Sequence, residues 1–202
     1  LASGAVSVPL NTSVSDDAIV AMLTDADIRA LVVSAEHRPR FEKLLPRFPG
    51  GLLRLCDEPA DGWTSLAALA DGQLASLPHL DLDGDAALNI IYSSGTTGLP
   101  KGILHTHRGR RDWAYDLAIA LRYHGAARTL LTIGLYSNIS WVAMLCTLLA
   151  GGTLVLHERF DAAAFLDTVA AEGITHTAMV PIQFQRVIDA QQDRPRNLAT
   201  MH

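Results

Sequence analysis

The sequence predicts an α/β fold built from parallel β-sheet layers with flanking helices. Short runs of Val, Ile and Leu alternate with longer stretches of helical period, as expected for parallel strands joined by crossover helices. The 202 residues are 49% hydrophobic and 18% charged, which provides enough apolar material for a sizeable core. We therefore expect a globular chain and not a disordered one.

Strand-like runs and helical stretches alternate in the first half of the chain. The strands are predicted at residues 4–10, 30–34 and 52–55. The first helix follows Ser15, a good N-cap with two acidic residues after it, and continues through Met22. Two shorter helices are predicted around residues 40–45 and 66–69. Polar segments that contain Gly, Pro and Asp connect these elements, at residues 57–62 and 76–85.

The second half repeats the alternation more clearly. A strand at residues 88–92 leads into a glycine-rich loop and then into a helix on which Trp113, Leu117 and Leu121 recur every four residues. Gly125 is expected to end that helix. The remaining elements are predicted as strands at residues 129–133, 153–156 and 175–180 and helices at 141–149 and 161–172, the last with Asp161 as N-cap and Gly173 as its stop.

Charge and cysteine content exclude several classes of protein. The net charge is −5 and no long run of Lys or Arg is present, so nucleic acid and anionic membranes are not expected as partners. Cys56 and Cys146 lie far apart without a CxxC neighbour, which argues against a disulfide framework and a thiolate metal site. A reducing cytoplasm is the expected compartment.

No integral membrane segment or secretion signal is expected. The most apolar stretch, residues 139–156, is interrupted by two glycines and is predicted as a helix, a turn and a strand. The start lacks both an initiating Met and a basic leader, and the end stops without a terminating element. We expect a piece of a longer protein.

The chemistry of the sequence is concentrated in YSSGTTGLPKG at residues 92–102, directly after a hydrophobic strand and shortly before a helix. Its glycines let backbone N–H groups turn toward one point, four hydroxyls add donors, and Lys101 brings a mobile positive charge. The common phosphate loop of NTPases is excluded, because Pro100 and Gly102 stand where it requires Gly and Ser or Thr. A plain surface turn needs no such density of donors, so we predict a polyphosphate cradle.

This loop, with Ile-Leu-His-Thr-His after it, resembles the signature of the adenylate-forming (AMP-binding) superfamily. Residues 4–11 resemble an early strand of that family, and residues 175–189 resemble a later strand–helix unit. GILHTHR and VPIQFQR are most similar to the acyl-CoA synthetase branch. The resemblance implies that residues 1–202 form an incomplete N-terminal AMP-binding domain, with its C-terminal part and a C-terminal lid domain outside this sequence.

The resemblance also implies an acid–thiol ligase of two steps. A carboxylic acid, fatty or aromatic, attacks Mg-ATP to give an acyl-adenylate and pyrophosphate, and coenzyme A then displaces AMP. The implied polyphosphate contacts are Ser93, Ser94, Gly95, Thr96, Thr97, Gly98 and Lys101, with Lys101 and Thr96 as catalytic residues. The family's residues for Mg²⁺, for ribose and the lid lysine fall outside this sequence, so we expect this piece alone to be inactive.

The acid pocket is predicted at Tyr136, Ser137 and Trp141, where the family usually shows Pro, an aromatic residue and His. Here Gly134 and Ser137 replace the Pro and the His, so no imidazole can orient the carboxylate at that position. Apolar walls with a few polar groups suit an organic acid. For Trp141 the alternative is core packing on a buried helix.

A basic cluster follows the loop, made of His105, His107, Arg108, Arg110 and Arg111. We predict a solvated helix face, with a phosphate of ATP or of coenzyme A nearby as the alternative. The two histidines lack a third ligand at sensible spacing, so no metal site is predicted.

Two further functions stay open from the sequence. One is an adenylation domain or acyl-AMP ligase that loads a carrier protein, and the other is a non-catalytic nucleotide-binding remnant. The identity of the acid and the oligomeric state, a homodimer included, are not specified by the sequence.

Overall fold

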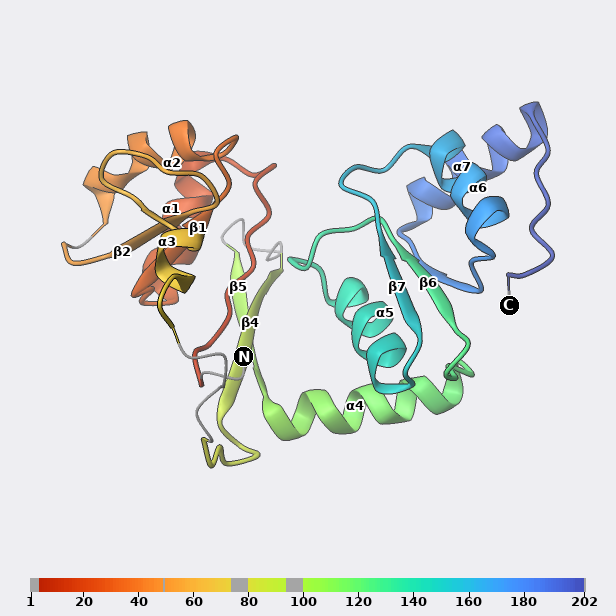
Figure 1. The fold of residues 1–202 in the computed structure, drawn as a ribbon, viewed down its shortest axis with the longest axis horizontal. Coiled ribbons are helices and arrows are strands. Elements are labelled where there is room, and N and C mark those ends of the chain that lie inside the picture. Colours follow the sequence, from red (N-terminus) through yellow and green to blue (C-terminus); the bar gives the residue numbers. More distant parts are fainter. Residues whose placement is uncertain (1–3, 49, 74–79, 94–99, 202) are drawn as a thin grey trace. The chain divides into compact units, whose positions relative to one another are not determined.

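The computed structural model describes residues 4–48, 50–73, 80–93 and 100–201, and the chain divides into two compact units (Figure 1). Unit 1 comprises residues 1–82 and 88–104, and unit 2 comprises residues 83–87 and 105–202. The alternation of helices and parallel strands predicted from the sequence is present in both units. The predicted α/β class is therefore confirmed.

Unit 1 contains a parallel sheet of order β1-β2-β3 and a separate two-stranded sheet. Its elements are α1 (Asp16–Asp25), β1 (Ala30–Val33), α2 (Arg38–Leu44), the 3-10 turn η1 (Leu45–Arg47), β2 (Leu53–Cys56), β3 (Thr64–Ser65), α3 (Leu66–Ala70), and most of β4 (Ala87–Ser93) and of β5 (Lys101–Thr106), whose outer ends at residues 87 and 105–106 belong to unit 2. The hydroxyl of Ser15 accepts a hydrogen bond from the Ala18 amide at 3.3 Å, as predicted for the N-cap of α1.

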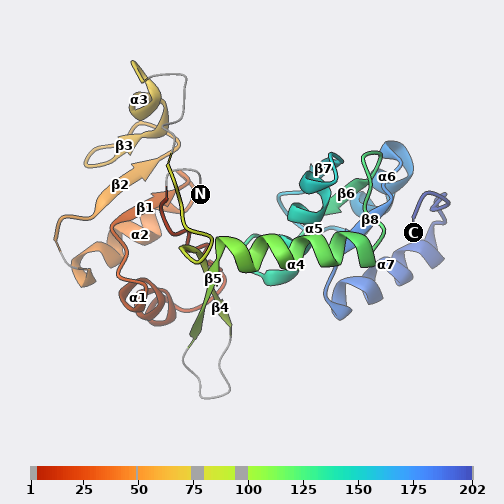
Figure 2. The same cartoon turned by 90° about the horizontal axis from the view of Figure 1, so that it is seen from below.

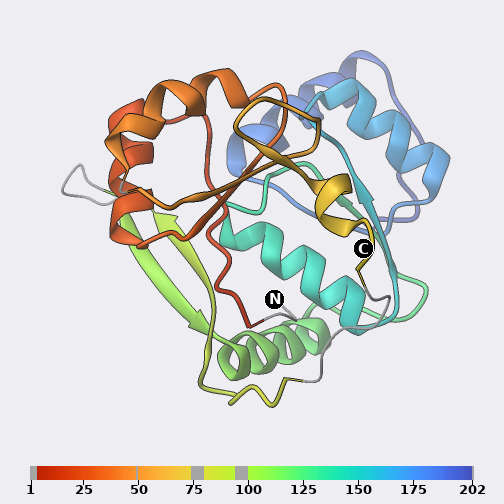
Figure 3. The same ribbon diagram turned by 60° about the vertical axis from the view of Figure 1, so that its left-hand side comes forward.

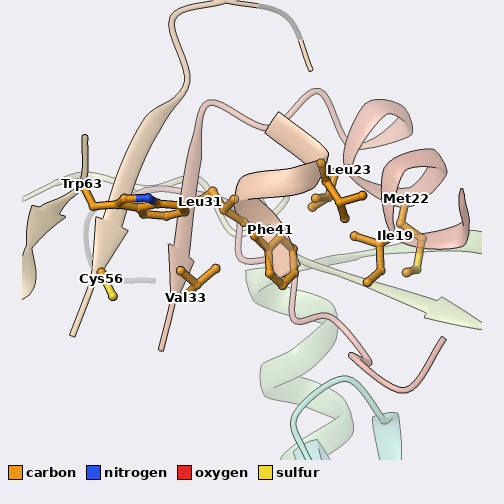
Figure 4. Close-up of a cluster of buried hydrophobic side chains, with 9 residues drawn as sticks. Ile19, Met22, Leu23, Leu31, Val33, Phe41, Cys56 and Trp63 are labelled. Atoms are coloured by element: carbon orange, nitrogen blue, oxygen red, sulfur yellow. The ribbon is translucent and has the colours of Figure 1, made fainter. Parts of the chain in front are cut away.

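The core of unit 1 lies between α1, α2 and the parallel sheet. Figure 4 shows the side chains that meet there. They are Ile19, Met22 and Leu23 from α1, Leu31 and Val33 from β1, Phe41 and Leu44 from α2, Cys56 from β2, and Trp63. The helical spacing of the α1 residues and the alternation on β1 place each set on one face.

The predicted strand at residues 4–10 is reduced to one bridge. Ser7 donates its amide to Leu88 O at 3.0 Å and accepts from the Ile90 amide at 2.9 Å, in parallel pairing with Asn89. Gly4 has a left-handed φ of 76° and Pro9 has no N–H to donate, so a regular ladder cannot extend far on either side of Ser7. The prediction of a full strand was wrong.

A strand that we did not predict separates the glycine-rich loop from the next helix. β5 lies beside β4 in a two-stranded sheet, as Figure 2 shows. Residues 94–100 connect the strands, which is too short a link for a parallel crossover, so the pair is an antiparallel hairpin. The expectation of a strand followed by a loop and then directly by a helix is corrected to strand, loop, strand and helix.

Unit 2 contains a parallel sheet of order β7-β6-β8. Its helix α5 covers one face of that sheet, and α6 and α7 cover the other (Figures 1 and 3). The elements of unit 2 are α4 (His107–Ala120), β6 (Arg128–Leu131), α5 (Asn138–Leu149), β7 (Thr153–Leu156), α6 (Ala162–Glu172), β8 (His176–Ala178) and α7 (Pro181–Asp193).

Successive side chains of β6 point to opposite faces of this sheet and pack against different helices. Leu130 is buried with Phe165, Val169 and other apolar residues of the α6 side. Thr129, its neighbour on the opposite face, has its hydroxyl 2.6 Å from the Thr147 hydroxyl on α5. Because β6 is central in the sheet and has helices on both faces, three of its four residues are buried.

The predicted end of α4 was wrong. The helix ends at Ala120, and the left-handed residue that follows is Arg122 with φ of 59°, so Gly125 is not its stop. The buried positions are Arg110 and Ala114, whereas Leu121 is 47% exposed. The half-buried Trp113 and Leu117 lie on the same helix face as these two residues, so the apolar period holds within α4 and fails only at Leu121, after the helix end.

The apolar stretch at residues 139–156 has the predicted form of a helix, a turn and a strand. It runs through α5, turns at residues 150–152 and enters β7. Among the residues that the structure describes, no helix is both long and apolar enough to span a bilayer.

Gly152 is required by the close approach of its backbone to β6. A Cβ at this position would lie 2.6 Å from Ala127 O, the acceptor of the first β7 amide, Thr153 N, at 2.8 Å. We expect Gly152→Ala to lower the free energy of unfolding by about 1–3 kcal/mol, since the strands must separate to admit the methyl group. Urea unfolding of the complete protein measures this loss.

Gly125→Ala is the matched control for that prediction. A Cβ at residue 125 would lie at an ordinary 3.4 Å from its nearest neighbour, Ala150 O. Equal unfolding midpoints for the two variants would contradict the requirement for glycine at residue 152.

Candidate active site

Of the predicted polyphosphate loop, the structure describes only the residues at its two ends. Ser93 is the last residue of β4 and Lys101 is the first residue of β5, and both are exposed. The five predicted contact residues between them, Ser94, Gly95, Thr96, Thr97 and Gly98, lie outside the described residues, so their roles stay predictions.

Lys101 is not engaged elsewhere in the described part of the chain. None of the ion pairs or side-chain hydrogen bonds found among the described residues involves its ammonium group. An exposed ammonium next to a glycine-rich loop is available to an anionic ligand. This placement agrees with the sequence-based interpretation of Lys101 as a phosphate contact.

The base of the loop is anchored to α1 through Tyr92. The Tyr92 hydroxyl lies 2.6 Å from Asp25 Oδ2 and 3.0 Å from Met22 O. Burial, with the hydrogen bond to Asp25 as a further cause, holds the pKa of Tyr92 well above its usual range, so the phenol stays a donor. No local sequence signal indicates this anchor, because Tyr92 and Asp25 are 67 positions apart.

Gly102 allows β5 to lie against the Tyr92 ring. A Cβ at Gly102 would lie 3.0 Å from Ile90 Cγ2 and 3.1 Å from two carbons of the Tyr92 ring. A side chain here would require Ile90 or the Tyr92 ring to shift by a few tenths of an ångström. The exposed Ser93 and Lys101 therefore lie at the ends of a two-stranded sheet in which Gly102 lies against the Tyr92 ring.

The predicted acid-pocket residues lie on the turn that leads into α5. The Ser137 amide donates to Gly134 O at 3.1 Å, and Tyr136 and Ser137 are half-buried. Trp141, one turn into the helix, is 2% exposed and donates through Nε1 to Leu135 O at 2.7 Å. The structure thus brings the three predicted residues together, with Trp141 packed beneath the turn. Its burial favours the packing interpretation of this residue.

The basic cluster separates into exposed and buried members. Arg108 and Arg111 are exposed and form ion pairs with Asp85 at 2.9 Å and Asp112 at 2.8 Å, as expected of a solvated face. Arg110 differs, because only 3% of it is exposed. The prediction of a solvated face was wrong for Arg110, which α4 directs toward α5.

Burial changes the protonation equilibria in this cluster. Desolvation lowers the pKa of the Arg110 guanidinium to about 10, so it is still charged at neutral pH. Burial, and next the positive charge of Arg110, lower the pKa of His105. Nε2 of His105 and Nε2 of His107 are buried without a hydrogen-bond partner among the described residues.

The described residues contain no group of three or more His, Cys, Asp or Glu side chains placed to hold a metal ion. Cys56 and Cys146 are buried free thiols, one in each unit. Burial raises the pKa of the Cys146 thiol, so it stays protonated in its apolar surroundings.

Comparison with known sequences gives consistent matches along the whole chain. A family described as AMP-binding enzyme matches residues 1–201. An indoleacetate–CoA ligase of Aromatoleum aromaticum is 32% identical over 209 residues, covering 98% of this chain and 39% of the relative. A long-chain-fatty-acid–CoA ligase of Mycobacterium tuberculosis is 27% identical over 201 residues, covering 95% and 38%. The chain spans about two fifths of the length of these relatives.

Solved structures agree in fold. The anthranilate–CoA ligase AuaEII, in complex with anthranoyl-AMP, superposes with a TM-score of 0.87 at 22% identity, over 98% of this chain and 40% of that one. ATP-bound MatB from Rhodopseudomonas palustris gives a TM-score of 0.81 at 24% identity, over 97% and 38%. At this level of identity the likeness concerns the fold.

Proposed function

Because this chain belongs to the AMP-binding enzyme family, we propose that the complete protein activates a carboxylic acid with ATP and transfers the acyl group to coenzyme A. The observation that carries the proposal is the pair of exposed polar residues, Ser93 and Lys101, at the ends of the YSSGTTGLPKG loop. Two sequence relatives support this proposal, since both are named as CoA ligases, one for long-chain fatty acids and one for indoleacetate.

In the first step of the proposed reaction, a carboxylate oxygen of the acid attacks the α-phosphorus of Mg-ATP, and the bond from that phosphorus to the bridging oxygen of pyrophosphate breaks. The contacts assigned to Ser93, Ser94, Gly95, Thr96, Thr97, Gly98 and Lys101 hold the β- and γ-phosphates. Lys101 and the Thr96 hydroxyl stabilise the negative charge that develops on the leaving pyrophosphate. Magnesium enters with the nucleotide.

In the second step, the thiol of coenzyme A attacks the acyl carbonyl, its proton is lost, and AMP leaves. Residues 1–202 belong in this scheme to an incomplete N-terminal AMP-binding domain. Tyr136 and Ser137 line one wall of the acid pocket, and Trp141 supports them from below. A fatty or aromatic acid suits such a wall. We place the reaction in the cytoplasm, where the free thiols Cys56 and Cys146 stay reduced.

Pyrophosphate release by the complete protein tests this function. The assay uses a panel of short-chain, fatty and aromatic acids, with and without coenzyme A. We expect release that depends on the acid, together with consumption of coenzyme A. Release without consumption of coenzyme A would favour a carrier-protein acceptor, and ATP binding without release for any acid would favour a non-catalytic nucleotide-binding protein.

Gly134 sets the position of Tyr136 in the proposed pocket. A Cβ at Gly134 would lie 2.7 Å from the Tyr136 ring, so the ring must move to admit it. Gly134→Ala in the complete protein should therefore change KM for the acid by about 3- to 10-fold, with little change in KM for ATP. Steady-state kinetics with each substrate varied in turn measure the two effects.

The control for that prediction is a double variant. In a Tyr136→Ala background the ring is absent, so adding Gly134→Ala should have no further effect on KM for the acid. An equal effect of Gly134→Ala in both backgrounds would show that the methyl group acts by another route.

A further inference from the structure

We propose that Arg110 is a positioning residue that determines acid specificity by holding the 134–138 turn, which carries Tyr136 and Ser137, against α4. The inference rests on the proposed function, because that turn forms a wall of the proposed acid pocket. Residue 110 lies outside both the signature loop and the turn itself, and its role depends on contacts that only the folded unit 2 provides.

Three contacts place the Arg110 guanidinium at the start of α5. Its Nη2 donates to Oδ1 of Asn138, the first residue of that helix, at 2.7 Å. Its central carbon lies 5.2 Å from the centre of the Trp141 ring and 4.9 Å from that of Trp113. Both separations are within the range of cation–π attraction. One planar cation thus contacts two residues of α5 and one of its own helix.

The turn is held by the first turn of α5, which includes Trp141, one of the residues that Arg110 contacts. Trp141 donates to Leu135 O at 2.7 Å, and Ser140 donates to Ile133 O at 2.9 Å, so the first turn of α5 holds the backbone on both sides of Gly134. Moving the guanidinium would release Asn138 and the Trp141 ring together. Tyr136 and Ser137, which lie on this turn, would then move as well.

The chemistry of this contact requires arginine and not merely a positive charge. A guanidinium is planar and can stack on indole rings while its N–H groups donate sideways to an amide oxygen. The ammonium of lysine is compact and more strongly hydrated, so it satisfies one of these contacts at a time. Because Arg110 is 3% exposed, its charge is retained only with its hydrogen bonds and ring contacts in place.

The test compares Arg110→Met, Arg110→Lys and the matched control Arg111→Met in the complete protein. Arg111 is the adjacent arginine, is exposed, and pairs with Asp112. The readouts are KM for the acid, KM for ATP, kcat, the rank order of acids in the panel and the thermal midpoint. Calorimetric binding of the acids in the presence of a non-hydrolysable ATP analogue gives a readout that does not require turnover.

We expect Arg110→Met to raise KM and Kd for the acid about tenfold, to change the rank order of acids, and to leave KM for ATP within about twofold. Arg110→Lys should fall between Arg110→Met and the wild type, and it carries the test if the Met variant does not fold. Arg111→Met should match the wild type.

Two results would overturn the inference alone. One is a wild type that turns over acid while both Arg110 variants keep its acid KM, Kd and rank order. The other is an Arg110 variant in which the thermal midpoint and kcat fall while the acid KM and Kd are unchanged, as a purely structural role requires. A wild type that neither binds nor converts any acid would overturn the proposed function as well.

Discussion

Replacing Lys101 with alanine in the complete protein is expected to lower kcat/KM for ATP by about 10- to 150-fold. A hydrogen bond from a charged donor contributes about 1.5–3 kcal/mol, and each 1.36 kcal/mol is a factor of ten in rate. Lys101 is exposed at the start of β5, directly after the loop, and its ammonium group is not engaged elsewhere in the described chain. The substitution removes that charge without disturbing the core. Pyrophosphate-release rates against ATP concentration measure the effect.

Lys43 provides the control for this prediction. It is the only other lysine in the sequence and is exposed on α2. Lys43→Ala removes the same charge from unit 1 and should leave kcat/KM for ATP unchanged. Lys101→Arg keeps the charge and should retain more activity than Lys101→Ala. If Lys101→Ala and Lys43→Ala behaved alike, Lys101 would not be a phosphate contact.

Replacing Trp141 with alanine is expected to lower the free energy of unfolding of unit 2 by about 3–5 kcal/mol, the range for loss of a large buried aromatic side chain. Trp141 is among the largest fully buried side chains of the chain and supports Leu135 O through its indole N–H. The substitution leaves a cavity, an unpaired carbonyl and one ring fewer beside Arg110. Urea unfolding followed by circular dichroism measures the loss.

Two variants separate the causes of that loss. Trp141→Phe keeps most of the apolar bulk and removes the hydrogen bond, so it should cost less than Trp141→Ala. Trp113→Ala removes the other ring that contacts Arg110, and because Trp113 is only half-buried its loss should also be smaller. A Trp141→Ala variant as stable as Trp113→Ala would mean that Trp141 is not a core residue.

The elements predicted best from the sequence carry local signals at both ends. α6 begins after Asp161, whose carboxylate accepts from the Ala164 amide at 2.8 Å, and ends at Gly173 with φ of 61°. β7 was predicted with its observed bounds, because two glycines precede it and a polar residue follows. In such cases the residues at the two ends of an element determine where it begins and where it ends.

Elements that depend on distant partners were predicted less well. β5 is stabilised by pairing with β4, and in the sequence its residues follow the glycine-rich loop without a turn signal before the helix. The burial of Arg110 was missed for the same reason, since only the packing of α5 shows which face of α4 is covered. Burial is a property of the assembled unit and not of one helix.

The candidate site shows the same division. Its chemical class follows from a short segment, because glycines, hydroxyls and Lys101 occur together in residues 93–101. The contacts that support the site cannot be predicted from a short segment. The hydrogen bond from Tyr92 to Asp25 and the close approach of the Tyr136 ring to Gly134 arise from the fold. The sequence pattern thus predicts what the loop binds, and the structure shows which residues hold its base.

Exchange of labelled pyrophosphate into ATP by the complete protein measures the proposed adenylation step by itself, because it does not require coenzyme A. We expect exchange that requires a carboxylic acid and that falls sharply in Lys101→Ala but not in Lys43→Ala. Exchange that proceeds equally well without an acid, or that is unaffected by Lys101→Ala, would contradict the assignment of residues 93–101 as the polyphosphate contact of an acid-activating enzyme.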